Sequence, residues 1–376
     1  MLSKKFGLKS GVSAKFFRND NTTSFADTIY NRSGNRIPVS SIGVAPQIQT
    51  NTKAQKYAAF FEFDWLLNPR VNINAGFRTD YFQFLNNKFY VGPRASVKLK
   101  LTDKLSTRIS GGIYYQSPSY VWVTNLFNKN LKALQNKMGI FGWDYLFRDD
   151  LRFSVEGFYK KYSNLPSGTA PGVTDYIVQT NTGTGFGGRE DDFQSFGYYN
   201  LTSTASGKSY GAELLLQKKF SEIPLYGLMS FSYGKSEVTA NNGITYPGQY
   251  DQRFIFNLSS GYIFNSKWEI STKFRYFTGA PFTTIYRPSE NPTNPGSIIN
   301  LPDDYLTDRT PEGHHLDIRV DRYFNFRNYT IIVYVDIQNI YNNKIPQRPS
   351  YDFWTDEIST SSSIGILPSI GISLEF

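Results

Sequence analysis

The sequence predicts an all-β fold, an antiparallel transmembrane β-barrel of about fourteen strands. Apolar and polar residues alternate with a period of two in one segment after another. The connections between these segments alternate between short and long. Aromatic residues make up 17% of the 376 residues, with 31 Phe and 27 Tyr, and this composition suits strands and the aromatic belts of membrane barrels better than helices.

The alternation separates whole segments into an apolar face and a polar face. Between 268 and 277, one face carries Trp268, Ile270, Phe274 and Tyr276, and the other carries Glu269, Ser271, Lys273 and Arg275. Similar patterns occupy 89–101, 151–160 and 329–338. We therefore expect strands near 5–17, 55–66, 70–82, 88–101, 105–116, 134–146, 150–163, 206–220, 224–238, 251–264, 267–278, 312–325, 328–341 and 363–376.

The connections distinguish a barrel from a soluble β-sandwich, whose strands would alternate as well. Tight links lie near 68–69, 102–104, 147–149, 221–223, 265–266 and 326–327. Longer links rich in Gly, Pro and Asn lie near 18–54, 117–133, 164–205, 239–250, 279–311 and 342–362, and the hairpin at 86–88 is short where a long link is due. Outer-membrane barrels have short periplasmic turns and long extracellular loops, with an even number of strands. Both ends of the chain are then expected on the periplasmic side.

Neither a membrane-spanning helix nor an export signal is visible in the sequence. No run approaches eighteen apolar residues, and Lys9 and Lys15 interrupt the apolar character of the first seventeen residues. Because an outer-membrane protein must be exported, we expect the gene to start upstream of Met1 or the reading frame to be a remnant. The chain has no cysteine, which excludes disulfides, thiolate metal sites and a cysteine nucleophile.

The last predicted strand ends on an aromatic residue. Ile370, Ile372, Leu374 and Phe376 share its outward face, opposite Ser369, Gly371, Ser373 and Glu375. A terminal strand that ends on Phe resembles the signal read by the outer-membrane barrel-assembly machinery. We expect Ile370, Ile372, Leu374 and Phe376 to form this assembly signal, with that machinery as a partner.

Six short stretches in order resemble the C-terminal barrel of TonB-dependent receptors. They are 209–215 (a "GxE" strand), 250–258 ("YDxRH…NL", with Phe254 where His is usual), 278–283 ("SGxPYT"), 316–320 ("LDLRV"), 336–342 ("DVxNLFN") and 367–376 ("LPxxGxxxxF"). Each motif is weak alone, and six in register over 209–376 make a strong case. Before residue 209 the resemblance rests on the rhythm of strands and loops.

The resemblance implies a transporter that imports a scarce nutrient of the siderophore, cobalamin or oligosaccharide class. Complete members of the family have a signal peptide, a TonB-contacting segment, a plug and a barrel of twenty-two strands. Residues 1–376 would form a single, partial barrel domain whose two free edges pair with an absent N-terminal portion. The TonB complex would act only through the absent plug region, and membrane lipid and lipopolysaccharide would surround the barrel in the outer membrane of a Gram-negative bacterium.

A stand-alone passive porin or fatty-acid-type channel of about fourteen strands is the first alternative, and an outer-membrane enzyme is the second.

Side chains are expected to divide among lumen, membrane interface and loops. The charged residues expected to face the lumen are Arg78, Arg94, Lys98, Lys100, Arg152, Glu156, Lys273 and Arg275. The aromatic residues expected in interface belts are Trp65, Tyr90, Trp143, Tyr159, Tyr233, Tyr262 and Trp268. Among the loop aromatics, Trp122, Tyr176, Tyr286 and Trp354 are the candidates for stacking on a sugar or chelator.

The sequence predicts no catalytic residue, metal site or cofactor. His314 and His315 are the only histidines, and neighbours in a strand point to opposite faces, so the two cannot share one metal. A base or metal role for His315 with Asp317 is conceivable, but a polar wall is the preferred interpretation. The glycine-rich run 183–188 is interpreted as a spacer, and the acidic groups 190–192 and 303–304 as solvated loop charge rather than calcium sites. The net charge of +9 is scattered along the chain, so no nucleic-acid partner is expected.

Overall fold

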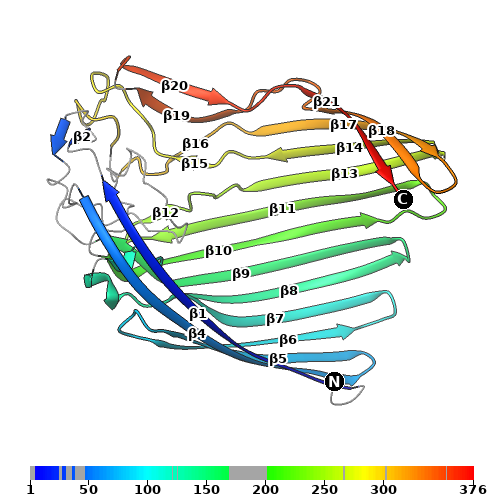
Figure 1. Cartoon of the computed structure of the whole chain (residues 1–376), viewed down its shortest axis with the longest axis horizontal. Helices are drawn as coiled ribbons and strands as arrows, with labels where there is room; N and C mark the ends of the chain where they lie inside the picture. The colour runs from blue at the N-terminus through cyan, green and yellow to red at the C-terminus, as the bar shows by residue number, and fades with distance from the viewer. Residues whose placement is uncertain are drawn as a thin grey trace.

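One antiparallel sheet forms most of the structure. The computed structural model of the chain describes residues 5–24, 28–30, 36–38, 47–120, 122–124, 126–168, 201–265, 267–300, 303–352 and 354–376. In its 15-stranded sheet, neighbouring strands follow one another in sequence order (Figure 1). The order is β1 (Phe6–Ser24), β4 (Gln47–Asn68), β5 (Val71–Phe82), β6 (Phe89–Lys100), β7 (Leu105–Gln116), β8 (Leu134–Arg148), β9 (Leu151–Gly168), β10 (Leu201–Lys218), β11 (Leu225–Thr239), β13 (Phe254–Asn265), β14 (Trp268–Phe277), β17 (Gly313–Asn325), β18 (Thr330–Gln338) and β21 (Leu367–Glu375), with β12 (Thr245–Pro247) paired to β11.

The predicted strands are confirmed, and four of them are longer than expected. β9 runs to Gly168 rather than 163, and β10 begins at Leu201 rather than 206. The largest extensions are those of β1 and β4. β1 continues past Phe17 to Ser24, and β4 begins at Gln47 rather than near residue 55. These extensions pair with each other, as in Asn19 opposite Thr52. Both extensions are polar, so the alternation of apolar residues that marks a lipid-facing strand cannot reveal them. In these extensions the two strands are held together by hydrogen bonds between their backbones.

Apart from the short connection between β5 and β6, short turns and long connections are segregated to opposite ends of the sheet, and both termini lie at the turn end (Figure 1). Side-chain oxygens close several of the turns by accepting backbone N–H groups. Asn68 Oδ1 accepts from Arg70 at 2.9 Å, Thr102 Oγ1 from Leu105 at 2.9 Å, and Asn265 Oδ1 from Lys267 at 2.8 Å. Asn and Thr favour tight turns for this reason, and the tight links predicted from sequence are confirmed.

The long connections carry small elements of their own. β2 (Thr28–Tyr30) pairs with β3 (Arg36–Pro38), β15 (Pro281–Phe282) with β16 (Asp308–Arg309), and β19 (Pro346–Asp352) with β20 (Glu357–Ser362). Two 3₁₀ helices, η2 (Trp122–Thr124) and η3 (Leu126–Asn130), lie between β7 and β8. The described residues include no helix long and apolar enough to cross a membrane.

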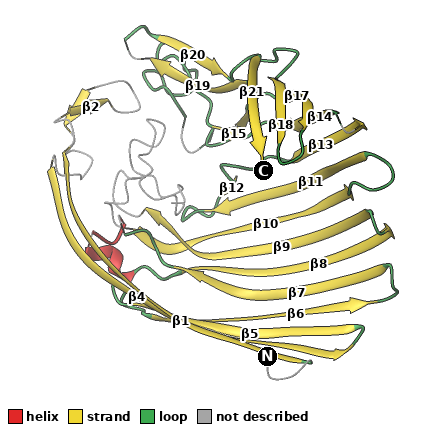
Figure 2. Cartoon of the chain, turned by 45° about the vertical axis from the view of Figure 1, so that its right-hand side comes forward, coloured by secondary structure: helices red, strands yellow, loops and turns green. Residues whose placement is uncertain are grey.

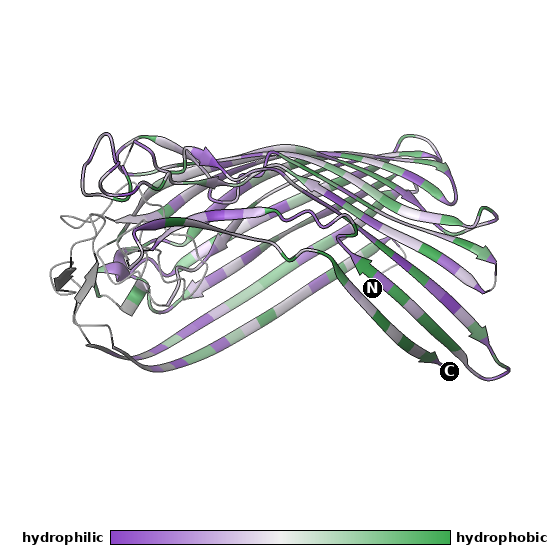
Figure 3. Ribbon diagram, turned by 90° about the horizontal axis from the view of Figure 1, so that it is seen from above, coloured by the Kyte–Doolittle hydropathy of each residue, from purple (hydrophilic) through white to green (hydrophobic). Residues whose placement is uncertain are grey.

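The two faces of the sheet differ in chemistry. Cross-strand pairs such as Ile109 opposite Phe141 and Trp143 opposite Val155 share the outer face. Ile109 is 52% exposed and Trp143 is 47% exposed, although both are large and apolar. Apolar and polar residues alternate along the strands (Figure 3). An apolar face turned to lipid and a polar face turned to an interior explain both observations.

The sheet is curved and open, as Figure 2 shows. β1 forms one edge and β21 the other, and the described strands do not join these two edges. Each edge presents a row of backbone N–H and C=O groups with no neighbouring strand. The fold is therefore an antiparallel barrel sheet that the described residues leave unclosed.

Candidate substrate site at the loop end

The charged residues predicted to face the lumen all lie on the inner face, and several are neutralised by neighbours. Arg78 pairs with Asp80 at 2.8 Å, and Arg108 with Glu156 at 2.5 Å. Arg152 also pairs with Asp144. These pairs lie half-exposed along the inner wall, where each contributes little to stability because water screens it. They hold charged side chains in fixed positions on a polar inner surface.

The inner surface at the loop end contains an aromatic cage around a lysine. The Lys56 Nζ lies 4.6 Å from the ring centre of Tyr120 and 5.6 to 5.7 Å from those of Phe17, Phe82 and Phe84. It also donates a hydrogen bond to Ser117 Oγ. Ring faces attract an ammonium group through their quadrupole. The cage thus ties the inner faces of β1, β4 and β5 to the connection between β7 and β8.

Asp251 fastens the long connection between β14 and β17 to the sheet. Its side chain is 0% exposed and accepts from Arg253 Nε at 2.7 Å and from Arg309 Nη2 at 2.5 Å. Asp251 Oδ1 also accepts the Ser236 backbone N–H at 2.6 Å. Arg309 Nη1 donates to the Gly279 carbonyl at 3.0 Å. The carboxylate therefore has its charge and its hydrogen bonds satisfied, as burial requires. The sequence motif that contains Asp251 and Arg253 does not indicate Arg309, which lies 58 residues further along the chain.

The four loop aromatics predicted to contact substrate have different surroundings. Trp122 is 2% exposed and packs with Leu131 and Leu201, so the described arrangement hides its ring from a ligand. Tyr286 is half-buried, and its hydroxyl donates to Asp304 Oδ2 at 3.0 Å. Trp354 is 88% exposed in the connection between β19 and β20, and Tyr176 lies outside the described residues. A role in substrate binding stays a prediction for all four.

Burial and the Asp304 carboxylate together raise the pKa of the Tyr286 hydroxyl above its ordinary value. Asp304 also accepts a hydrogen bond from Asn300 Nδ2 at 3.0 Å. Asp304 was expected to be a solvated loop charge. Its carboxylate instead accepts hydrogen bonds within the connection between β14 and β17. The hydrogen bond to Asp304 therefore holds the Tyr286 side chain in place at the loop end.

The two histidines point to opposite faces, as predicted. His314 is opposite Tyr276, and His315 is opposite Arg275. The His314 Nδ1 lies 2.8 Å from the Tyr341 hydroxyl oxygen. Asp317 Oδ1 accepts the Asn339 backbone N–H at 2.9 Å. Across the described ranges, no group of three His, Cys, Asp or Glu side chains comes together as a metal site would require.

The predicted aromatic belts lie on the outer face, with one exception. Trp65, Trp143, Tyr159 and Trp268 are between 36% and 51% exposed. The prediction was wrong for Tyr90, which is 7% exposed and faces inward. Its hydroxyl donates to the Asn87 carbonyl and accepts the Ala133 N–H, both at 2.9 Å. Tyr90 falls between outward-facing Phe89 and Val91 in β6, so the strand period directs it inward.

The predicted assembly signal lies on the edge strand β21. Ile370, Ile372 and Phe376 are 77%, 74% and 98% exposed, and Leu374 is 49% exposed. β21 pairs with β18 on one side. Recognition of these residues by an assembly machinery stays a prediction.

The antiparallel order, the segregated loops and the two chemically distinct faces define an outer-membrane β-barrel protein. The chain belongs to the TonB dependent receptor-like, beta-barrel family, whose model matches residues 2–340. Members of this family are receptors and transporters of the Gram-negative outer membrane. A comparison with curated protein sequences found no match.

Several solved structures share the fold at low sequence identity. The FrpB iron transporter from Neisseria meningitidis has a TM-score of 0.65 at 13% identity, covering 100% of this chain and 53% of that one. The ferric enterobactin receptor PfeA from Pseudomonas aeruginosa has a TM-score of 0.67 at 13% identity, covering 100% and 52%. The siderophore receptor PiuA from Acinetobacter baumannii has a TM-score of 0.62 at 12% identity, covering 98% and 52%. The chain spans about half the length of the structures it matches.

Proposed function

We propose that this chain forms a large part of the barrel of a TonB-dependent transporter that imports a scarce nutrient across the outer membrane. The observation that carries the proposal is the open sheet, whose strands run consecutively from β1 to β21 and end in two unpaired edges. Each unsatisfied backbone group in hydrocarbon costs several kcal/mol. Both edges must therefore be paired in the membrane, and the described strands leave them apart, which favours a larger barrel completed by further strands over a stand-alone porin of this size.

The proposed partners follow from this placement. The TonB complex acts through a plug region that is not part of the sheet described above. The barrel-assembly machinery reads the edge strand that carries Ile370, Ile372, Leu374 and Phe376. The nutrient enters at the loop end, where Trp354 and Tyr286 offer aromatic surfaces for a chelator or a sugar. Trp354 is the first residue to test because its ring is largely exposed.

The test is energy-dependent uptake in cells that make the whole protein. The matched structures include an iron transporter and a ferric enterobactin receptor, so ferric chelates are the first substrates to test, followed by cobalamin and oligosaccharides. We expect uptake that requires the gene and stops when a protonophore collapses the proton-motive force. Trp354→Ala is expected to raise the half-saturating concentration about tenfold through loss of ring stacking. Leu126→Ala removes another loop side chain that is largely exposed, at 72%, and serves as the control, with unchanged uptake.

Uptake that continues at full rate in the presence of the protonophore would support the passive channel and contradict the proposal. Hydrolysis of a lipid or peptide by the purified protein, abolished by His315→Ala, would support the enzyme. We expect neither result.

A further inference from the structure

The outer face of the sheet carries a row of lysines where lipid contact would favour apolar side chains. Lys137 in β8 is opposite Lys161 in β9, and Lys161 is opposite Lys208 in β10. All three are exposed. Like charges placed directly opposite each other on neighbouring strands are destabilising. The row therefore stores repulsion that a bound anion would relieve.

Acidic side chains compensate only one end of this row. Glu237 in β11 pairs with Lys208 at 2.9 Å and also with Lys235. Within the described ranges, no carboxylate lies within ion-pair distance of Lys137 or Lys161. The patch of Lys137, Lys161, Lys208 and Lys235, which we name the outer lysine patch, thus faces outward with one glutamate among four lysines.

A groove lies beside the outer lysine patch, on the face of the sheet that is turned to the membrane. It has a volume of about 560 Å³ and is lined by Pro93, Ala95, Gly111, Ile113, Gly139 and Tyr159 among others. Ala95, Gly111, Gly139 and Tyr159 are consecutive cross-strand partners, and three of these four have little or no side chain. Pro93 cannot donate to a neighbouring strand, and the pairing of β6 with β7 begins one residue later at Arg94.

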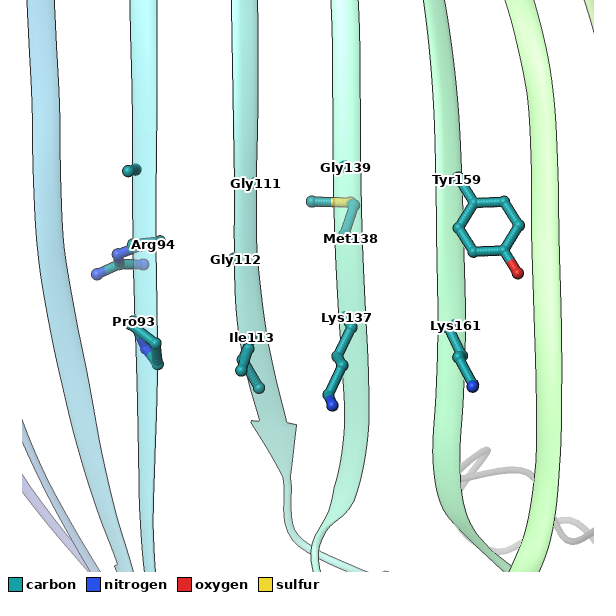
Figure 4. Close-up of a pocket in the computed structure, with 11 residues that line it drawn as sticks. Pro93, Arg94, Gly111, Gly112, Ile113, Lys137, Met138, Gly139, Tyr159 and Lys161 are labelled. Atoms are coloured by element: carbon teal, nitrogen blue, oxygen red, sulfur yellow. The ribbon is translucent and has the colours of Figure 1, made fainter.

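The lysines border the groove at its loop end. In Figure 4 the side chains of Ile113, Lys137 and Lys161 form one row and extend toward the long connections, with Gly111, Gly139 and Tyr159 one row deeper. The next row of outward-facing residues toward the turn end is apolar, as in Ile109 opposite Phe141. From the loop end toward the turn end, the outer face therefore carries first the lysines, then the groove, then an apolar surface. This order matches the charged head group and the acyl chains of a lipid in the outer leaflet.

The height of the row matches the outer membrane boundary. Lys161 lies ten residues beyond Leu151, the first residue of β9 after its turn. Ten residues rise about 33 Å along a strand, and a strand tilt of about 40° reduces this to roughly 25 Å, which is the height of the apolar band of outer-membrane barrels. Tyr159 and Tyr210, whose rings stack with centres 6.5 Å apart, lie just below as interface aromatics do.

We propose that the outer lysine patch and the groove beside it bind one lipopolysaccharide molecule of the outer leaflet, with its phosphates on Lys137, Lys161 and Lys208 and an acyl chain in the groove. Ammonium groups bind phosphate as point charges, and the outward direction of the patch places it against lipid rather than against the lumen. The site is independent of the nutrient and rests on the membrane placement of the sheet alone.

The test measures binding of lipopolysaccharide to the whole protein extracted in detergent from outer membranes. The first variant is Lys137→Gln/Lys161→Gln/Lys208→Gln, and its control Lys98→Gln/Lys100→Gln/Lys273→Gln removes the same charge from the inner face. Each lysine near an anionic lipid surface contributes about fivefold in affinity, so we expect a loss of up to about a hundredfold for the first variant and no change for the control. Wild-type protein should bind phosphatidylglycerol vesicles and dephosphorylated lipopolysaccharide at least about tenfold more weakly.

A second pair of variants tests the groove without changing charge. A Cβ added at Gly139 would meet no atom within 4 Å, and the same is true of a Cβ at Gly234 on the inner face. Gly139→Leu fills the groove and is expected to weaken binding about fivefold, whereas Gly234→Leu should leave it unchanged. Unchanged binding by the triple variant, an equal loss in its inner-face control, or equal binding of phosphatidylglycerol would each overturn the proposal. If the triple variant does not fold, unchanged binding by Gly139→Leu overturns it.

Discussion

Asp251 and Arg309 join two segments that lie 58 residues apart in the sequence, through a contact of 2.5 Å between Asp251 Oδ2 and Arg309 Nη2. The contact fastens the connection between β14 and β17 to the residues that precede β13. Arg253 holds the same carboxylate oxygen at 2.7 Å. Because the Asp251 side chain is fully buried, removal of its charge leaves two guanidinium groups without their partner.

Asp251→Asn is therefore expected to destabilise the folded protein by roughly 3 kcal/mol, the usual consequence of breaking a buried ion pair. The measurement is urea-induced unfolding in detergent micelles, followed by tryptophan fluorescence. Glu290→Gln provides the control, because Glu290 pairs with Arg287 on an exposed surface and should change the free energy of unfolding by less than about 0.5 kcal/mol. Equal effects of the two variants would show that Asp251 does not fasten the connection.

Lys56→Gln is expected to lower the free energy of unfolding by about 1 to 2 kcal/mol, because glutamine cannot interact with the four surrounding rings as an ammonium does. Lys53→Gln, three residues earlier on the same strand, changes an exposed lysine and should be neutral. Chemical unfolding of both variants measures the difference. A cost that is the same for both lysines would assign the effect to general charge rather than to the cage.

The glycine of the "GxE" strand has a steric role. A Cβ at Gly211 would lie 2.1 Å from the Tyr233 carbonyl oxygen, whereas a Cβ at Gly234 on the next strand would meet nothing within 4 Å. Gly211→Ala should destabilise the sheet by about 2 to 3 kcal/mol through overpacking. Gly234→Ala should be neutral or stabilising by a few tenths of a kcal/mol. Heat-modified migration in gels reports both, and a neutral Gly211→Ala would contradict the close approach of β10 and β11.

Asp150 in the turn between β8 and β9 gives a pH dependence with a definite sign. Hydrogen bonds from Lys218 and Ser221 and the nearby Arg148 charge lower the pKa of its carboxyl to about 2. The folded protein favours the ionised form of Asp150. The contribution of this carboxylate to the free energy of unfolding is therefore complete above the ordinary pKa of about 4, and it is lost as the pH falls through about 2. The stability difference between wild type and Asp150→Asn should thus be constant from neutral pH to about pH 5 and vanish near pH 2. A difference that grows on acidification would contradict the lowered pKa.

The strands and their faces could be predicted because one face meets lipid and the period-two pattern records it directly. The same rule fails where strands leave the membrane, so the period-two pattern does not predict the polar extensions of β1 and β4. It also fails for contacts between distant segments. The Asp251–Arg309 pair and the burial of Trp122 against Leu201 depend on how connections fold over the sheet end, and no local pattern in the sequence records that. The residue type of Tyr90 favours an interface belt, but its position between outward-facing Phe89 and Val91 directs its side chain inward.

The most direct test of the account is a cysteine scan along β18, in a chain whose 376 residues include no cysteine. Single cysteines replace Ile331, Ile332, Val333, Tyr334, Val335 and Asp336 in turn, and each carries a fluorophore in protein reconstituted in membranes that contain a lipid-soluble quencher. The account predicts strong quenching at 331, 333 and 335 and weak quenching at 332, 334 and 336. Equal quenching along the strand, or none at any position, would contradict a sheet with one face in hydrocarbon and the other in a polar interior.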